Sequence, residues 1–116
     1  MTDRELLELA AKAAGVEYDK FANYRFGLWL VIHHEPTELT RRSWNPLTDD
    51  GDALRMAVKL AINIEFFSSS NTVYVEPVGR GLSFDESLGN DPCVATRRAI
   101  VRAAAAIGKQ MKEQTP

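Results

Sequence analysis

Three acidic residues in one short segment are the first place where the sequence suggests chemistry. Asp49, Asp50 and Asp52 stand within four positions, and clustered carboxylates suit hard divalent cations. Their spacing does not match the calcium-binding loop, and the glutamate that closes such a loop is missing. Acids are also favoured at the start of a helix, where they accept hydrogen bonds from free N–H groups. We therefore expect these residues to start a helix and to bind no metal.

Cys93 is the single cysteine of the chain, so an internal disulfide is excluded. Its expected place is the first turn of a helix, where the helix dipole favours a nucleophilic thiolate. A nucleophile also needs a base, and nothing in the sequence places a histidine near Cys93. Free cysteines are among the most buried residues, which favours an inert, half-buried thiol. We therefore name no catalytic residue.

The two histidines, His33 and His34, are adjacent. On a strand their side chains point to opposite faces, so they cannot hold one metal together. With one cysteine and no third histidine, a structural zinc site is not expected. We interpret both as polar residues at a strand end and expect no metal or other cofactor.

Arginines form the strongest candidate binding surface. The last predicted helix carries three of them on one arc, namely Arg97, Arg98 and Arg102. Arg80 lies in a turn between two glycines, and Arg41 and Arg42 add further charge. Guanidinium groups bind phosphate oxygens bidentately, so a phosphate-bearing ligand would suit this surface. The alternative is a solvated helix face whose arginines pair with some of the 16 acids.

Composition limits the classes of protein that need to be considered. The chain has 116 residues, 45% hydrophobic and 26% charged, which fits one globular domain over 1–116 with a frayed tail at 113–116. The longest apolar run, residues 26–32, is too short to cross a bilayer, and the start lacks a signal-peptide pattern. The net charge of -2 argues against non-specific coating of nucleic acid. We expect a cytoplasmic protein with no membrane contact.

The first half of the chain predicts a helix and a strand. Residues 2–5 match a capping box, helical spacing of apolar residues follows, and Gly15 provides the stop, so a helix over 3–14 is predicted. Residues 16–25 predict an irregular loop whose aromatic residues pack against the core. Residues 26–33 are apolar on both sides and predict a strand covered on both faces. Residues 34–43 are polar, contain Pro36 and predict a mobile loop.

Residues 44–52 begin the second predicted helix, which continues to Ile64. Thr48 or Asp49 is its expected cap, and Trp44 is expected to pack in the core. One narrow polar stripe runs along this helix, made of Asp52, Arg55, Lys59 and Asn63. The remaining positions are nearly all apolar, so most of the helix surface is expected to be buried.

The last part of the chain predicts two strands and a long helix. Residues 64–67 and 72–76 predict a hairpin closed by 68–71, and residues 78–89 predict a loop. Asp91 and Pro92 begin the third helix as cap and first residue. The order is α-β-α-β-β-α. The predicted class is α/β of the α+β type, with a small, largely antiparallel sheet of three to four strands sandwiched between helices.

Two segments carry a resemblance to a known family. They are WNPLTDDGDALRMAVKL, residues 44–60, and DPCVATRRAIVRAAAAIGK, residues 91–109. Both resemble the phage ABA-sandwich domain family, small proteins of phage and prophage genomes. The resemblance covers the last two-thirds of the chain and the first helix, whereas residues 16–43 match poorly. It implies an α/β/α sandwich of phage or prophage origin in a bacterial host, and it implies no activity or catalytic residue.

The sequence therefore predicts a non-catalytic accessory protein of a phage or prophage. It lacks the Ser-His-Asp signature, the phosphate loop, the dinucleotide fingerprint and the zinc-protease motif. Its expected partner is a host or phage protein or a small ligand, and a homo-oligomer is expected because small domains often bury apolar surface against a copy. The alternative is a binder of nucleotides or nucleic acid through the arginines of the last helix and Arg80. A thiol or hydrolytic enzyme using Cys93 is the third hypothesis.

Overall fold

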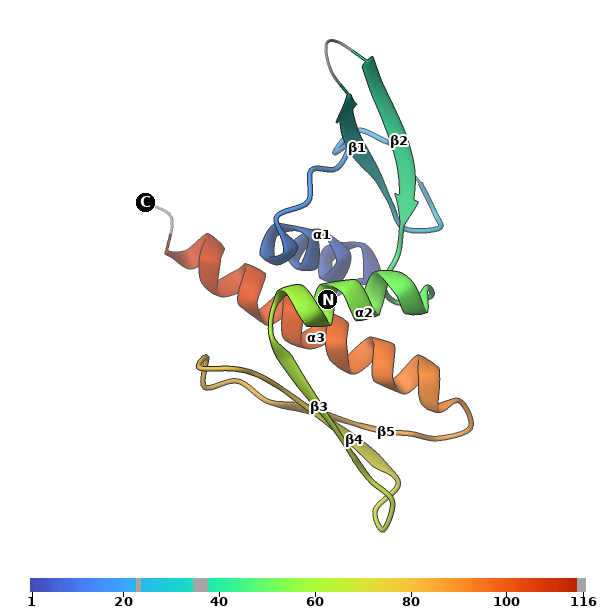
Figure 1. Cartoon of the computed structure of the whole chain (residues 1–116), viewed down its shortest axis with the longest axis vertical. Coiled ribbons are helices and arrows are strands. Elements are labelled where there is room, and N and C mark those ends of the chain that lie inside the picture. The colour runs from blue at the N-terminus through green and yellow to red at the C-terminus, as the bar shows by residue number, and fades with distance from the viewer. Residues whose placement is uncertain (23, 35–37, 115–116) are drawn as a thin grey trace.

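The computed structural model describes residues 1–22, 24–34 and 38–114, and it gives only the backbone for residues 33, 34 and 38–40. This part of the chain contains three helices and two antiparallel sheets (Figure 1). The elements are α1 (Asp3–Ala14), β1 (Leu28–His34), β2 (Glu38–Trp44), α2 (Asp50–Lys59), β3 (Ile62–Phe67), β4 (Thr72–Pro77), β5 (Phe84–Ser87) and α3 (Pro92–Glu113). The predicted α+β class is confirmed.

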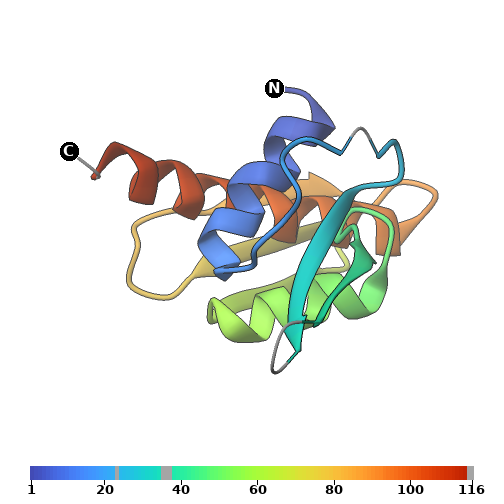
Figure 2. The ribbon, with the colours of Figure 1, turned by 90° about the horizontal axis from the view of Figure 1, so that it is seen from above.

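The helices lie in the middle of the molecule, and the strands lie at its two ends. The hairpin β1–β2 projects from one side of the helices, and the sheet β3–β4–β5 covers α3 on the other (Figures 1 and 2). The extents are 53 × 34 × 26 Å, so the molecule is elongated. The strands therefore form two sheets with helices between them, instead of the single expected sheet between helices. Each sheet pairs neighbouring segments of the chain, and α2 separates the two along the sequence.

The first helix begins and ends at the predicted residues, which act through neighbours close in the sequence. The Thr2 hydroxyl accepts a hydrogen bond from the N–H of Glu5 at 3.1 Å, and Gly15 ends the helix with φ 70°. α1 packs across α3 through small residues, including Ala10 and Ala11, which are fully buried. At the crossing a Cβ added to Gly108 would overlap the carbonyl oxygen of Leu9. The two helices approach closely because this position has no side chain.

Residues 34–43 do not form the predicted loop. β2 pairs antiparallel with β1 from Leu28 opposite Trp44 to His34 opposite Glu38, and Pro36 lies outside the described residues. The prediction was wrong because a two-stranded ribbon leaves one face in water, so its strands need no apolar pattern. β1 is covered mainly on one face, with Leu28 and Leu30 buried but Trp29 half-buried. Trp44 is buried in the core, as predicted.

The loop before β1 contacts the core less than expected. Tyr18 packs against the core and forms an isolated bridge with Leu30. Tyr24 stacks on Trp29 with ring centroids 4.3 Å apart. Phe21, however, is 97% exposed, so the expectation that it packs inward was wrong.

α2 is shorter and far more exposed than predicted. It ends at Lys59, and the turn through Ala61, at φ 53°, leads directly into β3. Leu54 and Val58 are 61% and 74% exposed, because α2 packs on the rest of the molecule only through the side that carries Ala53, Met56 and Ala57. The polar stripe was also predicted wrongly, since Asp52 is buried and Asn63 lies on β3.

The second sheet contains one strand that was not predicted. The hairpin of β3 and β4 is confirmed, with Ile64 opposite Val75. β5 lies within the predicted loop 78–89 and pairs with β4, with Phe84 opposite Val75. α3 then begins at Pro92 with Asp91 as its cap, as predicted. In the described part of the chain no helix is long and apolar enough to cross a membrane.

Candidate functional site

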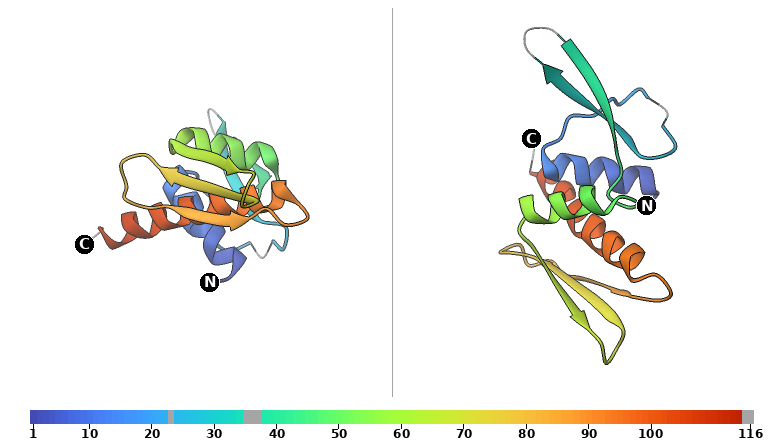
Figure 3. Two further views of the ribbon diagram at one scale, coloured as in Figure 1. Left: turned by 90° about the horizontal axis from the view of Figure 1, so that it is seen from below. Right: turned by 45° about the vertical axis from the view of Figure 1, so that its right-hand side comes forward.

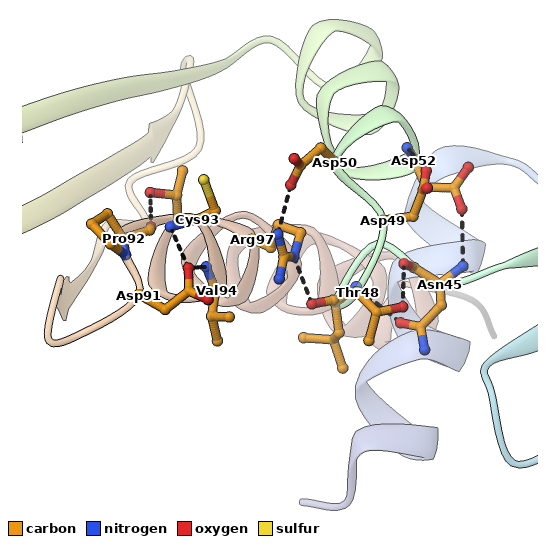
Figure 4. A network of polar contacts seen from close by, with 12 residues as sticks. Asn45, Thr48, Asp49, Asp50, Asp52, Asp91, Pro92, Cys93, Val94 and Arg97 are labelled. Atoms are coloured by element: carbon orange, nitrogen blue, oxygen red, sulfur yellow. Dashed lines mark hydrogen bonds and ion pairs between the residues drawn. The ribbon is translucent and has the colours of Figure 1, made fainter.

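The three acidic residues at the start of α2 make different structural contacts (Figure 4). Asp49 caps the helix by accepting from the N–H of Asp52 at 2.8 Å. Asp52, 4% exposed, accepts from the N–H of Asn45 at 3.0 Å and from Arg55 at 2.8 Å. Asp50 accepts from Arg97 at 2.6 Å. The predicted helix-starting function is confirmed. Among the side chains of residues 1–22, 24–32 and 41–114, no group of three or more His, Cys, Asp or Glu could hold a metal ion.

Arg97 is the most enclosed of the candidate arginines. Its side chain is 14% exposed, and its Nε donates to the carbonyl oxygen of Leu47 at 2.8 Å. Its Nη1 donates to Asp50. These bonds join the first half of α3 to the segment that begins α2, so the guanidinium is already occupied by the protein itself.

The other candidate arginines have partners on different elements. Arg98 pairs with Asp3 of α1 at 3.6 Å. Arg102 donates to Glu86 of β5 at 2.9 Å, and its guanidinium lies 5.0 Å from the centroid of the Phe84 ring. Arg80 is exposed in the turn after β4, beside the last residues of α3. The structure therefore does not gather Arg97, Arg98, Arg102 and Arg80 into one site.

The remaining basic residues named from the sequence stabilise the hairpin β1–β2. Arg41 pairs with Asp19 at 3.2 Å, and Arg42 pairs with the buried Asp52 at 3.4 Å. The side chains of His33 and His34 lie outside the described residues. Their interpretation as polar strand-end residues stays a prediction.

Cys93 is exposed, so the expectation of a half-buried thiol was wrong. It lies in the first turn of α3, where Asp91 accepts from its N–H at 3.1 Å. Figure 4 shows Cys93 and Asp50 on the same side of α3. In this position the thiol lies on the wall of an open cleft.

This cleft, which we call the apolar cleft, is the site that sequence reasoning missed. Its volume is about 260 Å³, and it is formed by α2, β3 and the first turns of α3. Its lining residues are mostly apolar and include Ala53, Leu54, Ile64, Phe66, Cys93 and Ile100. The ion pair of Asp50 and Arg97 is also part of its wall. The cleft therefore offers apolar contact area and few free polar groups.

Large apolar side chains continue from the cleft onto the surface. Leu54 and Phe66 are 61% and 59% exposed. Val58 lies one turn after Leu54 on the same side of α2 and is 74% exposed. In the described sheet, β3 pairs with β4 on one side and with no strand on the other. Figure 3 shows α2 along this edge of the sheet. We call Leu54, Val58, Ile64 and Phe66 the apolar face.

The sequence contained a signal for this face. A helix that is apolar nearly all round must be buried, and the residues up to Ile64 predict such a helix. The periodicity cannot say whether the covering surface belongs to the same chain. In the structure one side of α2 packs inward and the other side is open.

Two tyrosines have a shifted pKa, and neither lies in the cleft. Burial raises the pKa of Tyr18 above its ordinary value, helped by the hydrogen bond that its hydroxyl donates to Glu8 at 3.0 Å. The hydrogen bond from Tyr74 to Glu76 raises the pKa of Tyr74. Both shifts mark structural contacts away from the apolar face.

Comparisons with protein-family models, with curated proteins and with solved structures found no significant match to this chain.

Proposed function

We propose that the chain is a non-catalytic protein-binding module that takes its partner on the apolar face. The observation that carries this proposal is the exposure of Leu54, Val58 and Phe66 beside one cleft. Large contiguous apolar patches are rare on free surfaces and mark sites of interaction. Covering such side chains stabilises a complex in proportion to the apolar area removed from water, about 25 cal/mol per Å².

The chemistry of the cleft supports binding over catalysis. The carboxylate of Asp50 and the guanidinium of Arg97 neutralise each other. The Thr96 hydroxyl donates to the carbonyl oxygen of Pro92 at 2.7 Å. The thiol of Cys93 is the reactive group on the wall, and among the described neighbours that line the cleft there is no histidine to act as its base.

An accessory protein of a phage or prophage is the proposed biological setting. That part of the proposal depends on the resemblance of residues 44–60 and 91–109. Both segments contribute to the cleft, the first with Leu54 and the second with Cys93. A cytoplasmic location in the bacterial host belongs to the same proposal.

The arginines of α3 are the weaker candidate for function. A phosphate-bearing ligand at Arg97 must displace Asp50, and a ligand at Arg102 must displace Glu86. The apolar face needs no such exchange before a partner binds. A nucleotide or nucleic acid would bind with strong salt dependence, which a thermal-melt screen at two salt concentrations measures directly.

A photo-cross-linker on the apolar face tests the proposed function. Val58 does not line the cleft and is the most exposed residue of the apolar face, so replacing it with p-benzoylphenylalanine places the reactive group on that face. Irradiation in bacterial host extract is expected to give discrete cross-linked products, including any product of twice the chain's own mass. Adding Leu54→Glu is expected to abolish them. Phe21→Glu is the matched control, because it removes an exposed apolar side chain elsewhere. Equal products from both variants, or none from the parent, would contradict the proposal.

A further inference from the structure

The two edges of the sheet β3–β4–β5 differ in their protection. β5 has four residues and carries Asp85 and Glu86, and Arg102 donates to the Asp85 carbonyl oxygen at 3.2 Å. Short length and charge are common ways to keep an edge strand from pairing with another chain. β3 has six residues, INIEFF, with four large apolar residues and no lysine or proline. The β3 edge is therefore longer and less charged than the β5 edge, with Glu65 as its single charged residue.

The apolar face of α2 lies next to this unprotected edge. Leu54 lines the cleft together with Ile64 and Phe66, and Val58 continues the same side of α2. A strand that pairs with β3 meets the unpaired N–H and C=O groups of the edge, but it leaves Leu54 and Val58 in water. A partner that carries a strand with an apolar helix above it covers both the edge and these two side chains. A second copy of this chain carries that combination in β3 and α2.

The polar side chains of β3, Asn63 and Glu65, are complementary to each other in one register. A two-fold axis through the sheet requires a residue to lie opposite itself. With Ile64 opposite Ile64, each Asn63 lies opposite Glu65 of the other copy, and the amide can donate to the carboxylate. Moving the axis to Glu65 places two carboxylates opposite each other, which is unfavourable. Both polar side chains are exposed in the single chain, so they are free to make these contacts.

We infer that the partner on the apolar face is a second copy of this chain. The inference rests on the proposed function, because it names the occupant of the same surface. The two β3 strands pair antiparallel about Ile64, joining the two sheets into one of six strands across the dimer. The two α2 helices then lie side by side and cover Leu54 and Val58.

Opposite charges introduced at Asn63 test this pairing. Each substitution acts twice in a two-fold dimer, opposite both copies of Glu65. Asn63→Lys is expected to tighten the dimer about tenfold, and Asn63→Asp is expected to weaken it by a similar factor, since each cross-strand pair contributes a few-fold in the association constant. Sedimentation equilibrium of the full chain measures both constants. Glu76 lies opposite Asn63 within the chain, so urea unfolding of each variant separates effects on folding from effects on association.

The outcomes distinguish this inference from the proposed function. A dimer that responds with these signs and dissociates with Leu54→Glu, but not with Phe21→Glu, supports it. A chain that stays monomeric at millimolar concentration overturns it, as does a dimer that is indifferent to the charge at residue 63. If such a monomer still gives Leu54-dependent cross-links to other proteins, only the identity of the partner is wrong. If the cross-links are also missing, the proposed function fails as well.

Discussion

α3 contributes to two contrasting regions of the molecule. On one side it crosses α1, where Ala10, Ala11 and Gly108 let the two backbones approach closely and little surface stays open. On the other side its first turns face α2 and β3 across the apolar cleft, where Leu54 and Phe66 are more than half exposed. Both regions are apolar. The first is closed by residues of the same chain, whereas the second is open, and we propose that a partner covers it.

The closed region should be the more sensitive one to added volume. We expect Gly108→Val to lower the free energy of unfolding by about 3 kcal/mol or to prevent folding, because the new side chain overlaps the Leu9 carbonyl oxygen. Gly51→Ala is the matched control in α2. Its Cβ would lie 3.1 Å from Nη1 of Arg55 and 3.3 Å from Oδ2 of Asp49, and alanine is the better helix former, so the free energy of unfolding should change by less than about 0.5 kcal/mol. Urea unfolding monitored by circular dichroism measures both.

The first turn of α2 contains a buried carboxylate, whereas the apolar side of the helix is exposed. Asp52 is 4% exposed and accepts from Asn45 and Arg55. Asp52→Ala should cost about 2 kcal/mol, because the half-buried N–H of Asn45 and two guanidinium groups lose their acceptor. Asp49→Ala removes only the cap and should cost about 1 kcal/mol. Thermal unfolding of both variants measures the two losses of stability. An equal loss would show that the burial of Asp52 adds nothing to the stability of the folded chain.

Alkaline pH should slightly lower the free energy of unfolding through Tyr18. The pKa of Tyr18 is raised in the folded chain, so the folded state holds its proton more tightly than the unfolded state does. This contribution is fully present below the ordinary tyrosine pKa of about 10 and is lost as pH rises through the folded value. Tyr18→Phe should therefore cost about 0.5 kcal/mol at neutral pH and less at high pH. Unfolding experiments over a series of pH values, with Tyr74→Phe as a comparison, measure the cost of Tyr18→Phe in free energy of unfolding. A cost that stayed constant over pH would contradict the prediction.

The open region should tolerate polar substitution. Leu54→Ser is expected to change the free energy of unfolding by less than about 0.5 kcal/mol in dilute solution, since the side chain is 61% exposed. Ile100→Ala, at the buried wall of the same cleft, should cost about 2–4 kcal/mol. A large loss of stability from Leu54→Ser in the dilute protein would mean that α2 needs Leu54 for its own packing.

The parts of the fold that the sequence predicts well depend on near neighbours in the chain. The caps Thr2, Asp49 and Asp91 each bond to a backbone group two or three residues away, so residue type and spacing suffice to find them. The hairpin of β3 and β4 is local in the same sense. These signals set the element order and the α+β class without knowledge of tertiary contacts.

The missed features depend on partners that periodicity does not reveal. β2 and β5 are polar strands held by pairing with one neighbour, so no apolar pattern marks them. The exposure of Leu54 and Val58 depends on which surface covers α2, and that surface is missing from the described chain. The arginines of α3 share one arc in sequence, yet Arg97, Arg98 and Arg102 reach acids on three different segments.

Hydrogen–deuterium exchange at the two edges of the sheet β3–β4–β5 is the most direct test of pairing between two copies through β3. Peptides covering β3 and β5 are compared in dilute and in concentrated solutions of the unmodified chain. We expect amides of Ile62–Phe67 to exchange more slowly in the concentrated sample, and those of Phe84–Ser87 to exchange at the same rate in both. Equal exchange of β3 at both concentrations, or protection of β5 instead, would contradict the inference that two copies of the chain pair through the β3 edge and its apolar face.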